Sequence, residues 1–121
     1  MTEHRVLIVD DNLEYAETMA AALAKRGFAT TVAFDAHTAL ELVETVQPQS
    51  MLIDIALPDM SGWSLARLLG ARPRAPRMIA VSALGQAIHC TRSTAAGFKR
   101  HIVKPAKLAE LVAALREPHV A

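Results

Sequence analysis

Four short apolar runs in this chain each end on a polar residue. The runs cover residues 6–9, 51–53, 78–81 and 102–103. The polar residues that follow them are Asp10 with Asp11, then Asp54, then Ser82, and then Lys104 with Pro105. Apolar runs without alternation are typical of strands buried on both faces of a parallel sheet. Because the carboxyl ends of parallel strands share one edge of the sheet, we expect these polar groups to gather at that edge, where ligands bind in such folds.

Strand-like and helix-like patterns alternate along the whole chain with short connections, which indicates an α/β domain. The predicted strands cover residues 5–10, 30–34, 50–54, 78–82 and 99–103, and the second is polar enough to be an edge strand. Right-handed crossovers between parallel strands place helices on both faces and give three layers. A strand order of 2-1-3-4-5 would put the first and third strands side by side at the switch point.

Apolar residues at helical spacing predict a helix after each strand. The first starts near Leu13 and stops at Gly27, and the second runs from a cap at Asp35 to a stop before Pro48. Two more are predicted after a cap at Ser61 and over about residues 86–96, the latter with poor helix propensity. A closing helix carries apolar residues between positions 108 and 115.

The predicted strand order brings Asp10, Asp11 and Asp54 together. Three crowded carboxylates raise one another's pKa unless a cation lies among them. A hard divalent ion resolves this conflict, and Mg²⁺ (or Mn²⁺) suits a site of a few carboxylates, water and phosphate oxygens. Read alone, the Asp10–Asp11 pair is also typical of a helix cap, and that alternative stays open from the sequence.

Composition removes several other classes of function. The chain has 121 residues, 52% of them hydrophobic, and a net charge of +1, so it has material for a core and no global field for nucleic acid or membrane. A basic stretch at Arg67, Arg72, Arg74 and Arg77 reads as a solvated loop, without any accompanying nucleic-acid-binding element. With one cysteine and no signal-peptide pattern, we expect a single domain over residues 1–121 in the cytoplasm, with no membrane partner.

The five polar groups suit phosphoryl transfer. The Asp54 carboxylate can attack phosphorus and form an aspartyl phosphate. A metal ion and the Lys104 ammonium can neutralise charge on the transferred oxygens, and the Ser82 hydroxyl can donate a hydrogen bond to one of them. That bond would draw the loop after the fourth strand toward the site, which is a plausible switch.

The chain resembles the receiver domain of two-component response regulators, which are CheY-like. The matching segments are VLIVDDN (6–12), MLIDIALPDMSGW (51–63), AVSA (80–83) and GFKRHIVKP (97–105). The resemblance implies a three-layer (βα)5 flavodoxin-like sandwich. It also implies a phosphorelay module that receives its phosphoryl group from the phosphohistidine of a histidine kinase or a histidine phosphotransfer protein.

By this resemblance Asp54 is the phosphoacceptor, and Asp10, Asp11, Asp54 and the backbone carbonyl of Ala56 hold the metal. Ser82 and Lys104 contact the phosphoryl group, and the Lys104–Pro105 bond is expected to be cis. The family's output surface lies on the fourth helix, fifth strand and fifth helix, and it would bind a downstream protein or a second copy after phosphorylation.

Two positions depart from the commonest pattern of the family. His101 stands where an aromatic switch residue is usual, so it is either a switch residue together with Ser82 or a passive strand residue. Ala56, two residues after Asp54, has no polar side chain to orient or block a hydrolytic water. We therefore predict that Ala56 exerts little direct control over dephosphorylation.

Other functions remain as alternatives. A pseudo-receiver would keep the fold and dock partners without phosphorylation, although the five polar site residues argue against it. A phosphatase with an aspartyl intermediate requires a second acidic residue at position 56, where this chain has Ala56. A flavin protein requires a phosphate-binding loop after the first strand, where Asp10 and Asp11 would repel phosphate. We expect no turnover of a small-molecule substrate. The sequence leaves open whether the chain is a stand-alone regulator or part of a longer one.

Overall fold

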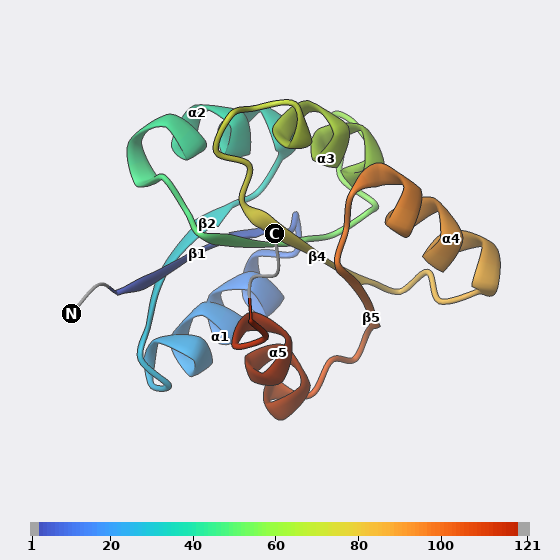
Figure 1. The fold of residues 1–121 in the computed structure, drawn as a ribbon. Coiled ribbons are helices and arrows are strands. Elements are labelled where there is room, and N and C mark those ends of the chain that lie inside the picture. Colours follow the sequence, from blue (N-terminus) through green and yellow to red (C-terminus); the bar gives the residue numbers. More distant parts are fainter. Residues whose placement is uncertain (1–2, 119–121) are drawn as a thin grey trace.

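The computed structural model describes residues 3–118, and residues 1–2 and 119–121 of the predicted domain lie outside it. Strands and helices alternate through the described residues (Figure 1). The strands are β1 (His4–Val9), β2 (Phe28–Ala33), β3 (Ser50–Ile53), β4 (Arg77–Ser82) and β5 (Arg100–Val103). The helices are α1 (Leu13–Ala24), α2 (Ala36–Val46), α3 (Gly62–Gly70), α4 (Ala87–Ala96) and α5 (Leu108–Leu115).

The sheet has the predicted parallel order β2-β1-β3-β4-β5. Val9 at the end of β1 pairs with Ile53 at the end of β3. The backbone N–H of Asp54 continues this ladder by donating to the carbonyl of Val9 at 2.9 Å. This register places the residues that follow β1 and β3 next to each other at the carboxyl edge of the sheet.

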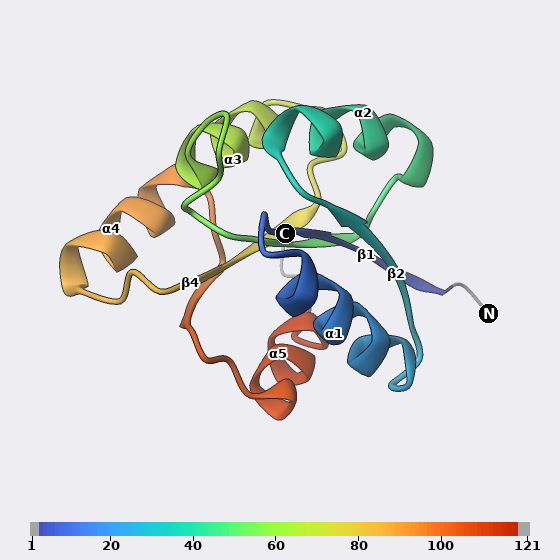
Figure 2. The same cartoon turned by 180° about the vertical axis from the view of Figure 1, so that it is seen from behind.

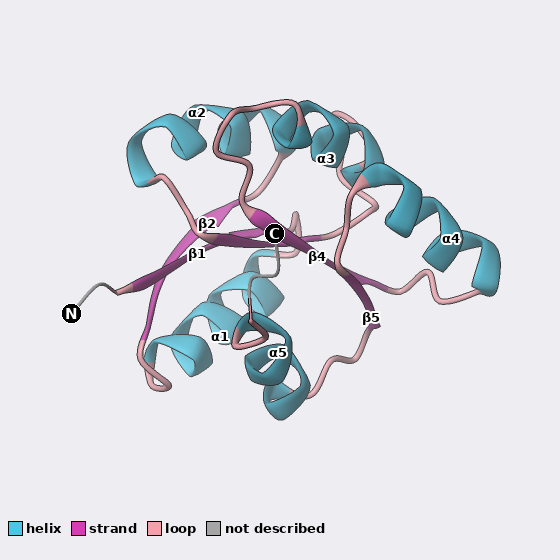
Figure 3. Cartoon of the chain, viewed as in Figure 1, coloured by secondary structure: helices cyan, strands magenta, loops and turns pink. Residues whose placement is uncertain are grey.

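Helices cover both faces of the sheet. Figures 1 and 2 show α1 and α5 on one face and α2, α3 and α4 on the other, and Figure 3 gives the same layers by element type. Along β1, Leu7 and Val9 pack toward α2 and α3, while Val6 and Ile8 pack toward α1 and α5. The continuous apolar runs therefore belong to strands buried on both faces, as predicted, and the partly exposed β2 lies at an edge.

Most element boundaries match the sequence prediction within one or two residues. The clearest difference is β2, which begins at Phe28 rather than at residue 30 and ends before Phe34. Phe28 is buried and pairs with His4 at the start of β1, so the sheet register extends the strand backwards. Gly27, the predicted helix stop, has a φ of 94° in the turn between α1 and β2.

Side-chain caps fix the starts of the first three helices. Asp35 accepts a hydrogen bond from the N–H of Thr38 at 2.7 Å, and Ser61 accepts one from the N–H of Ser64 at 3.1 Å, as predicted. Helix α4 begins after Gln86 without a side-chain cap, in keeping with its poor propensity. Among residues 3–118 there is no helix with the length and apolarity needed to cross a membrane.

Candidate functional site

Three neighbouring strands end in the same local geometry. Beyond β1, Asp10 Oδ1 accepts a hydrogen bond from the N–H two residues later at 2.9 Å. Asp54 Oδ1 after β3 and Ser82 Oγ at the end of β4 do the same, at 3.1 and 3.2 Å. A short polar side chain that bonds its own backbone in this way competes with strand continuation. The polar residues therefore end the strands and are held at the sheet edge.

The carboxylates of Asp10, Asp11 and Asp54 form one cluster. One oxygen from each lies within 4.8 Å of the others. Asp10 and Asp54 are buried, whereas Asp11 is exposed. The alternative interpretation of the Asp10–Asp11 pair as a helix cap is wrong, because the side chain that caps α1 is Asn12, which accepts from the N–H of Tyr15 at 3.0 Å.

Lys104 closes the cluster from β5. Its ammonium donates to Asp10 Oδ2 at 2.7 Å and to Asp54 Oδ2 at 3.0 Å. Burial lowers the pKa of Lys104, but the hydrogen bonds to the two carboxylates outweigh this effect and leave the pKa above its ordinary value. The Lys104–Pro105 peptide bond is cis, as the family resemblance predicts. The Lys104 side chain is thus charged at neutral pH and lies between the buried side chains of Asp10 and Asp54.

Ser82 lies beside Lys104 at the same edge. Its side chain is fully buried, and its backbone carbonyl accepts a hydrogen bond from the N–H of Lys104 at 2.9 Å. Because Ser82 Oγ already accepts from the N–H of Leu84, its own proton is free for another acceptor. The hydroxyl proton is therefore available for donation, and its predicted contact with a phosphoryl group stays a prediction.

His101 uses both ring nitrogens. Nε2 contacts the carbonyl of Leu84, which only accepts, so Nε2 carries the proton. Nδ1 lies 2.7 Å from Ser93 Oγ, which in turn accepts from Trp63 Nε1 at 2.9 Å. The ring thus connects the loop after β4 with α4 and, through Ser93, with α3. Its action as a switch stays a prediction.

Ala56 is exposed in the loop that follows the cluster. Its N–H donates to Asp54 Oδ1 at 3.1 Å, so its backbone helps to orient that carboxylate. The predicted role of its carbonyl as a metal ligand stays a prediction.

The loop after β3 is anchored to α2 by a contact that sequence reasoning missed. Asp59 accepts hydrogen bonds from the N–H groups of Ala36 and His37 at 2.9 and 2.8 Å, and its carboxylate also pairs with the His37 ring. The hydrogen bond from the N–H of Ala36 holds the pKa of Asp59 well below its usual range, although desolvation opposes it. The N–H and the ring of His37 lower the pKa further by smaller amounts. Asp59 lies between Pro58 and Met60, and nothing in that local sequence indicates that its partners lie at the start of α2.

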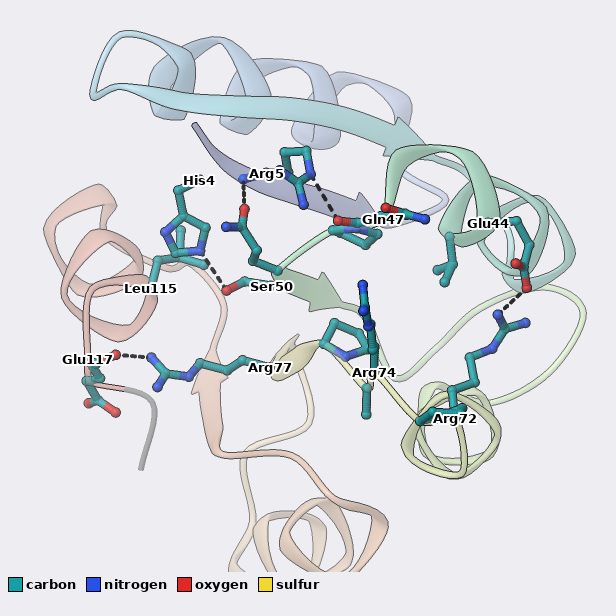
Figure 4. A pocket seen from close by; sticks show the side chains of 16 residues that line it. His4, Arg5, Glu44, Gln47, Ser50, Arg72, Arg74, Arg77, Leu115 and Glu117 are labelled. Carbon is teal, nitrogen blue, oxygen red and sulfur yellow. Dashed lines mark hydrogen bonds and ion pairs between the residues drawn. The ribbon is translucent and has the colours of Figure 1, made fainter. Parts of the chain in front are cut away.

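A second concavity of about 900 Å³ lies at the opposite, amino edge of the sheet (Figure 4). Arg5 Nε there donates to the carbonyls of Val46 and Gln47 at the end of α2. Arg77 is buried and donates to the carbonyl of Glu117 after α5. The prediction of a solvated basic loop is wrong for Arg77, because its guanidinium compensates the unpaired carbonyls of a helix end.

These arginines have a structural explanation in the electrostatics of the edge. Helices α2, α3 and α5 all point their carboxyl ends, with the negative ends of their dipoles, toward this concavity. Basic side chains balance that charge, and Arg72 pairs with Glu44. The arginine contacts at this edge therefore stabilise the fold.

Comparison with known proteins agrees with this geometry. The sequence model of the response regulator receiver domain matches residues 6–116. The DNA-binding response regulator MtrA of Mycobacterium tuberculosis is 34% identical over 112 residues, which are 93% of this chain and 49% of MtrA. The probable transcriptional regulatory protein SilR of Salmonella typhimurium is 30% identical over the same shares. The chain spans about half the length of these curated relatives.

Solved structures show the same fold. A CheY-like response regulator receiver domain protein from Methanospirillum hungatei JF-1 superposes with a TM-score of 0.88 at 28% identity, covering 96% of this chain and 93% of that one. The receiver domain of the Francisella response regulator 1452 also gives 0.88 at 28% identity, over 93% of each chain.

Proposed function

Because this chain belongs to the response regulator receiver domain family of two-component systems, we propose that it accepts a phosphoryl group on Asp54 from a partner phosphohistidine. The observation that carries the proposal is the meeting of Asp10, Asp11 and Asp54 within 4.8 Å, with Lys104 bonded to two of them. A nucleophile, an acidic cluster and a fixed cation are the parts that phosphoryl transfer requires.

The donor set fits Mg²⁺ or Mn²⁺. Carboxylate oxygens are the preferred ligands of these hard ions, and a cluster with two buried members is costly without neighbouring positive charge. Asp10, Asp11 and Asp54 would hold the ion together with the backbone carbonyl of Ala56. When bound, the ion would neutralise negative charge on the phosphoryl oxygens.

Three side chains have separate roles in the proposed transfer. A carboxylate oxygen of Asp54 forms a bond to phosphorus as the bond between phosphorus and the donor imidazole nitrogen breaks. The ammonium of Lys104 stabilises charge on the phosphoryl oxygens and keeps its proton, because its pKa is raised. The Ser82 hydroxyl donates to the transferred group.

Ser82 and His101 would transmit the result. The N–H of Leu84 donates to Ser82 and its carbonyl accepts from His101, so one residue joins the two. A phosphoryl group that engages Ser82 would therefore disturb the bond to His101, and through Ser93 the packing of α4. The output surface is expected on α4, β5 and α5, where it would bind a downstream protein or a second copy.

We propose a signalling module rather than a turnover enzyme on a small-molecule substrate, acting in the cytoplasm without direct contact to nucleic acid. Its direct partner would be a histidine kinase or a histidine phosphotransfer protein. Phosphorylation-independent docking is less favoured, since such a module needs neither the buried carboxylates nor the lysine between them.

Incubation with acetyl phosphate and Mg²⁺, followed by intact mass, tests the proposal. The wild type should gain one phosphoryl group, and chelation of the metal should prevent it. Asp54→Ala and the matched isostere Asp54→Asn should gain none, because both lack the nucleophilic oxygen. Incorporation that persists in these variants contradicts the assignment, and no gain by the wild type favours docking alone.

A further inference from the structure

The aromatic ring of Tyr15 lies against the ammonium of Lys104. The distance from Lys104 Nζ to the ring centroid is 4.5 Å, which is within the range of a cation–π interaction. The ring thus provides a third contact for an ammonium that otherwise depends on two carboxylates. This contact joins α1 to the residue that follows β5, 89 positions later in the sequence.

Local structure fixes where the ring points. Tyr15 is the third residue of α1, and its N–H donates to the capping side chain of Asn12 at 3.0 Å. Tyr15 also lines, with Asp10 and Asp54, a small cavity of about 10 Å³ beneath the carboxylate cluster. Such a space holds at most about one water molecule. The ring is therefore a wall of the site, held by a capped helix end.

The phenol hydroxyl of Tyr15 also indicates that packing of the ring determines where this side chain lies. The Tyr15 hydroxyl is buried and makes no hydrogen bond of ordinary length and angle among residues 3–118, although the backbone of Ala106 lies near enough to lower the pKa of the phenol slightly. Burial raises the pKa of Tyr15, and the nearby positive charge of Lys104 opposes the rise. A buried hydroxyl without a partner is unfavourable, so the hydrogen bonding of this group does not explain its placement.

The ring contact differs from the carboxylate contacts in one respect. Asp54 and Asp10 are both partners of Lys104. Phosphoryl transfer changes the charge and geometry of Asp54, and a bound metal ion would use Asp10 as a ligand. The face of the Tyr15 ring takes part in neither event. It can therefore hold the ammonium in place before and after transfer, when a flexible lysine side chain would otherwise gain rotamer freedom.

We infer that Tyr15 is a positioning residue that keeps the Lys104 ammonium at the carboxylate cluster during phosphoryl transfer. The inference rests on the proposed function for its consequence, but the contact itself can be tested without phosphorylation. The aromatic face, rather than the hydroxyl, is the part that acts.

Nuclear magnetic resonance of the unphosphorylated protein tests the contact. The Cε protons of Lys104 should show an upfield ring-current shift in the wild type and in Tyr15→Phe, which keeps the ring. The shift should vanish in Tyr15→Leu and Tyr15→Met, and it should persist in Thr18→Ala, a change at an exposed position one turn along α1. A Lys104 resonance that is the same in Tyr15→Leu or Tyr15→Met as in the wild type overturns the inference.

Binding of beryllofluoride, a phosphoryl analogue, with Mg²⁺ tests the consequence. Loss of the ring should weaken binding about fivefold, the size of a partly desolvated cation–π contact, and Tyr15→Phe should restore it. In a Lys104→Ala background the Tyr15→Leu change should have no further effect, because Tyr15 acts through Lys104. If Tyr15→Leu weakens beryllofluoride binding equally in the wild-type and Lys104→Ala backgrounds, the role of Tyr15 is merely structural and the inference is overturned. Failure of the proposed function would instead appear as no binding by the wild type.

Discussion

At the scale of single residues, the site depends on how each side chain is held. Asp10, Asp54 and Ser82 each accept a hydrogen bond from the backbone two residues later. One oxygen of each carboxylate is thereby fixed, while the other contacts Lys104. The site thus orients its nucleophile through backbone N–H groups, which substitutions of neighbouring side chains largely preserve.

Ala56 provides a test at this scale. Its exposed methyl group offers no polar atom to a water that attacks the aspartyl phosphate. We expect Ala56→Asn to change the rate of phosphoryl loss by less than about twofold, which is a small change in activation free energy. Loss of the phosphoryl group over time, followed by intact mass, measures the rate. Ala83→Asn, at another exposed alanine beside the site, is the control, and a large change confined to Ala56→Asn would contradict the prediction.

At the scale of elements, loops are tied to helices by side chains far apart in sequence. Asp59, in the loop after β3, accepts from the first N–H groups of α2. This contact adds a second acceptor to the helix start already capped by Asp35. The loop that carries Ala56 is therefore held at one end by Asp54 and near the other by α2.

The pair of His37 and Asp59 predicts a pH dependence of stability. The hydrogen bond to Asp59 and its charge raise the pKa of His37 above 6.5. Stabilisation by this pair is therefore present below the unfolded pKa of histidine, as long as Asp59 is ionised, and is lost as pH rises through the higher folded pKa. The thermal midpoints of wild type and His37→Ala should differ more at about pH 5.5 than at about pH 8.5. The Asp59→Asn variant should abolish that pH dependence, and a gap that widens with rising pH would contradict the sign.

Gly62 shows how closely α3 approaches the end of β3. A Cβ atom at Gly62 would lie 2.4 Å from the backbone oxygen of Asp54, too close without a backbone shift. We expect Gly62→Ala to lower the free energy of unfolding by about 2 kcal/mol and to slow phosphorylation. Urea unfolding measures the first effect and intact mass the second.

Gly70, at the other end of α3, is the matched control. A Cβ there would meet the terminal carbon of Met78 at an ordinary 3.8 Å. Gly70→Ala should be neutral or stabilising by up to about 1 kcal/mol, since alanine favours helix over glycine. Equal destabilisation by the two substitutions would show that close approach to Asp54 is not the cause.

At the scale of the whole molecule, the carboxyl edge of the sheet carries the candidate site, and the amino edge contributes to stability. The acidic cluster lies at the carboxyl edge. The carboxyl ends of helices α2, α3 and α5 face the amino edge, whose concavity Figure 4 shows. Buried Arg77 connects α5 to the start of β4, at the far end of the strand from Ser82. Stability and chemistry can therefore be perturbed separately.

Arg77→Ala tests this separation. The substitution leaves carbonyls at the end of α5 without their donor and should lower the free energy of unfolding by about 2 kcal/mol. Arg74→Ala, an exposed change in the loop before β4, should stay within about 0.5 kcal/mol. Urea unfolding measures both. Under conditions where Arg77→Ala is fully folded, its phosphorylation rate should match that of the wild type. A slower rate in the folded variant would contradict the claim that the amino edge affects stability without affecting the chemistry at the carboxyl edge.

The sequence by itself determined the order of elements, the parallel sheet and the residues at its carboxyl edge. Local patterns carry this information, because apolar runs and capping residues act within a few positions of one another. The caps at Asp35 and Ser61 and the boundaries of β3 follow from such signals.

Only the tertiary structure decided which distant side chains complete the site. Different elements are joined by Tyr15 against Lys104, by Asp59 against the start of α2, and by the hydrogen bonds from Trp63 through Ser93 to His101. Buried Arg77 joins distant elements in the same way at the opposite edge of the sheet. None has a local sequence signal, because each partner is chosen by the register of the sheet and the packing of helices upon it. Residue type gave the chemistry of the site, and packing gave its contacts.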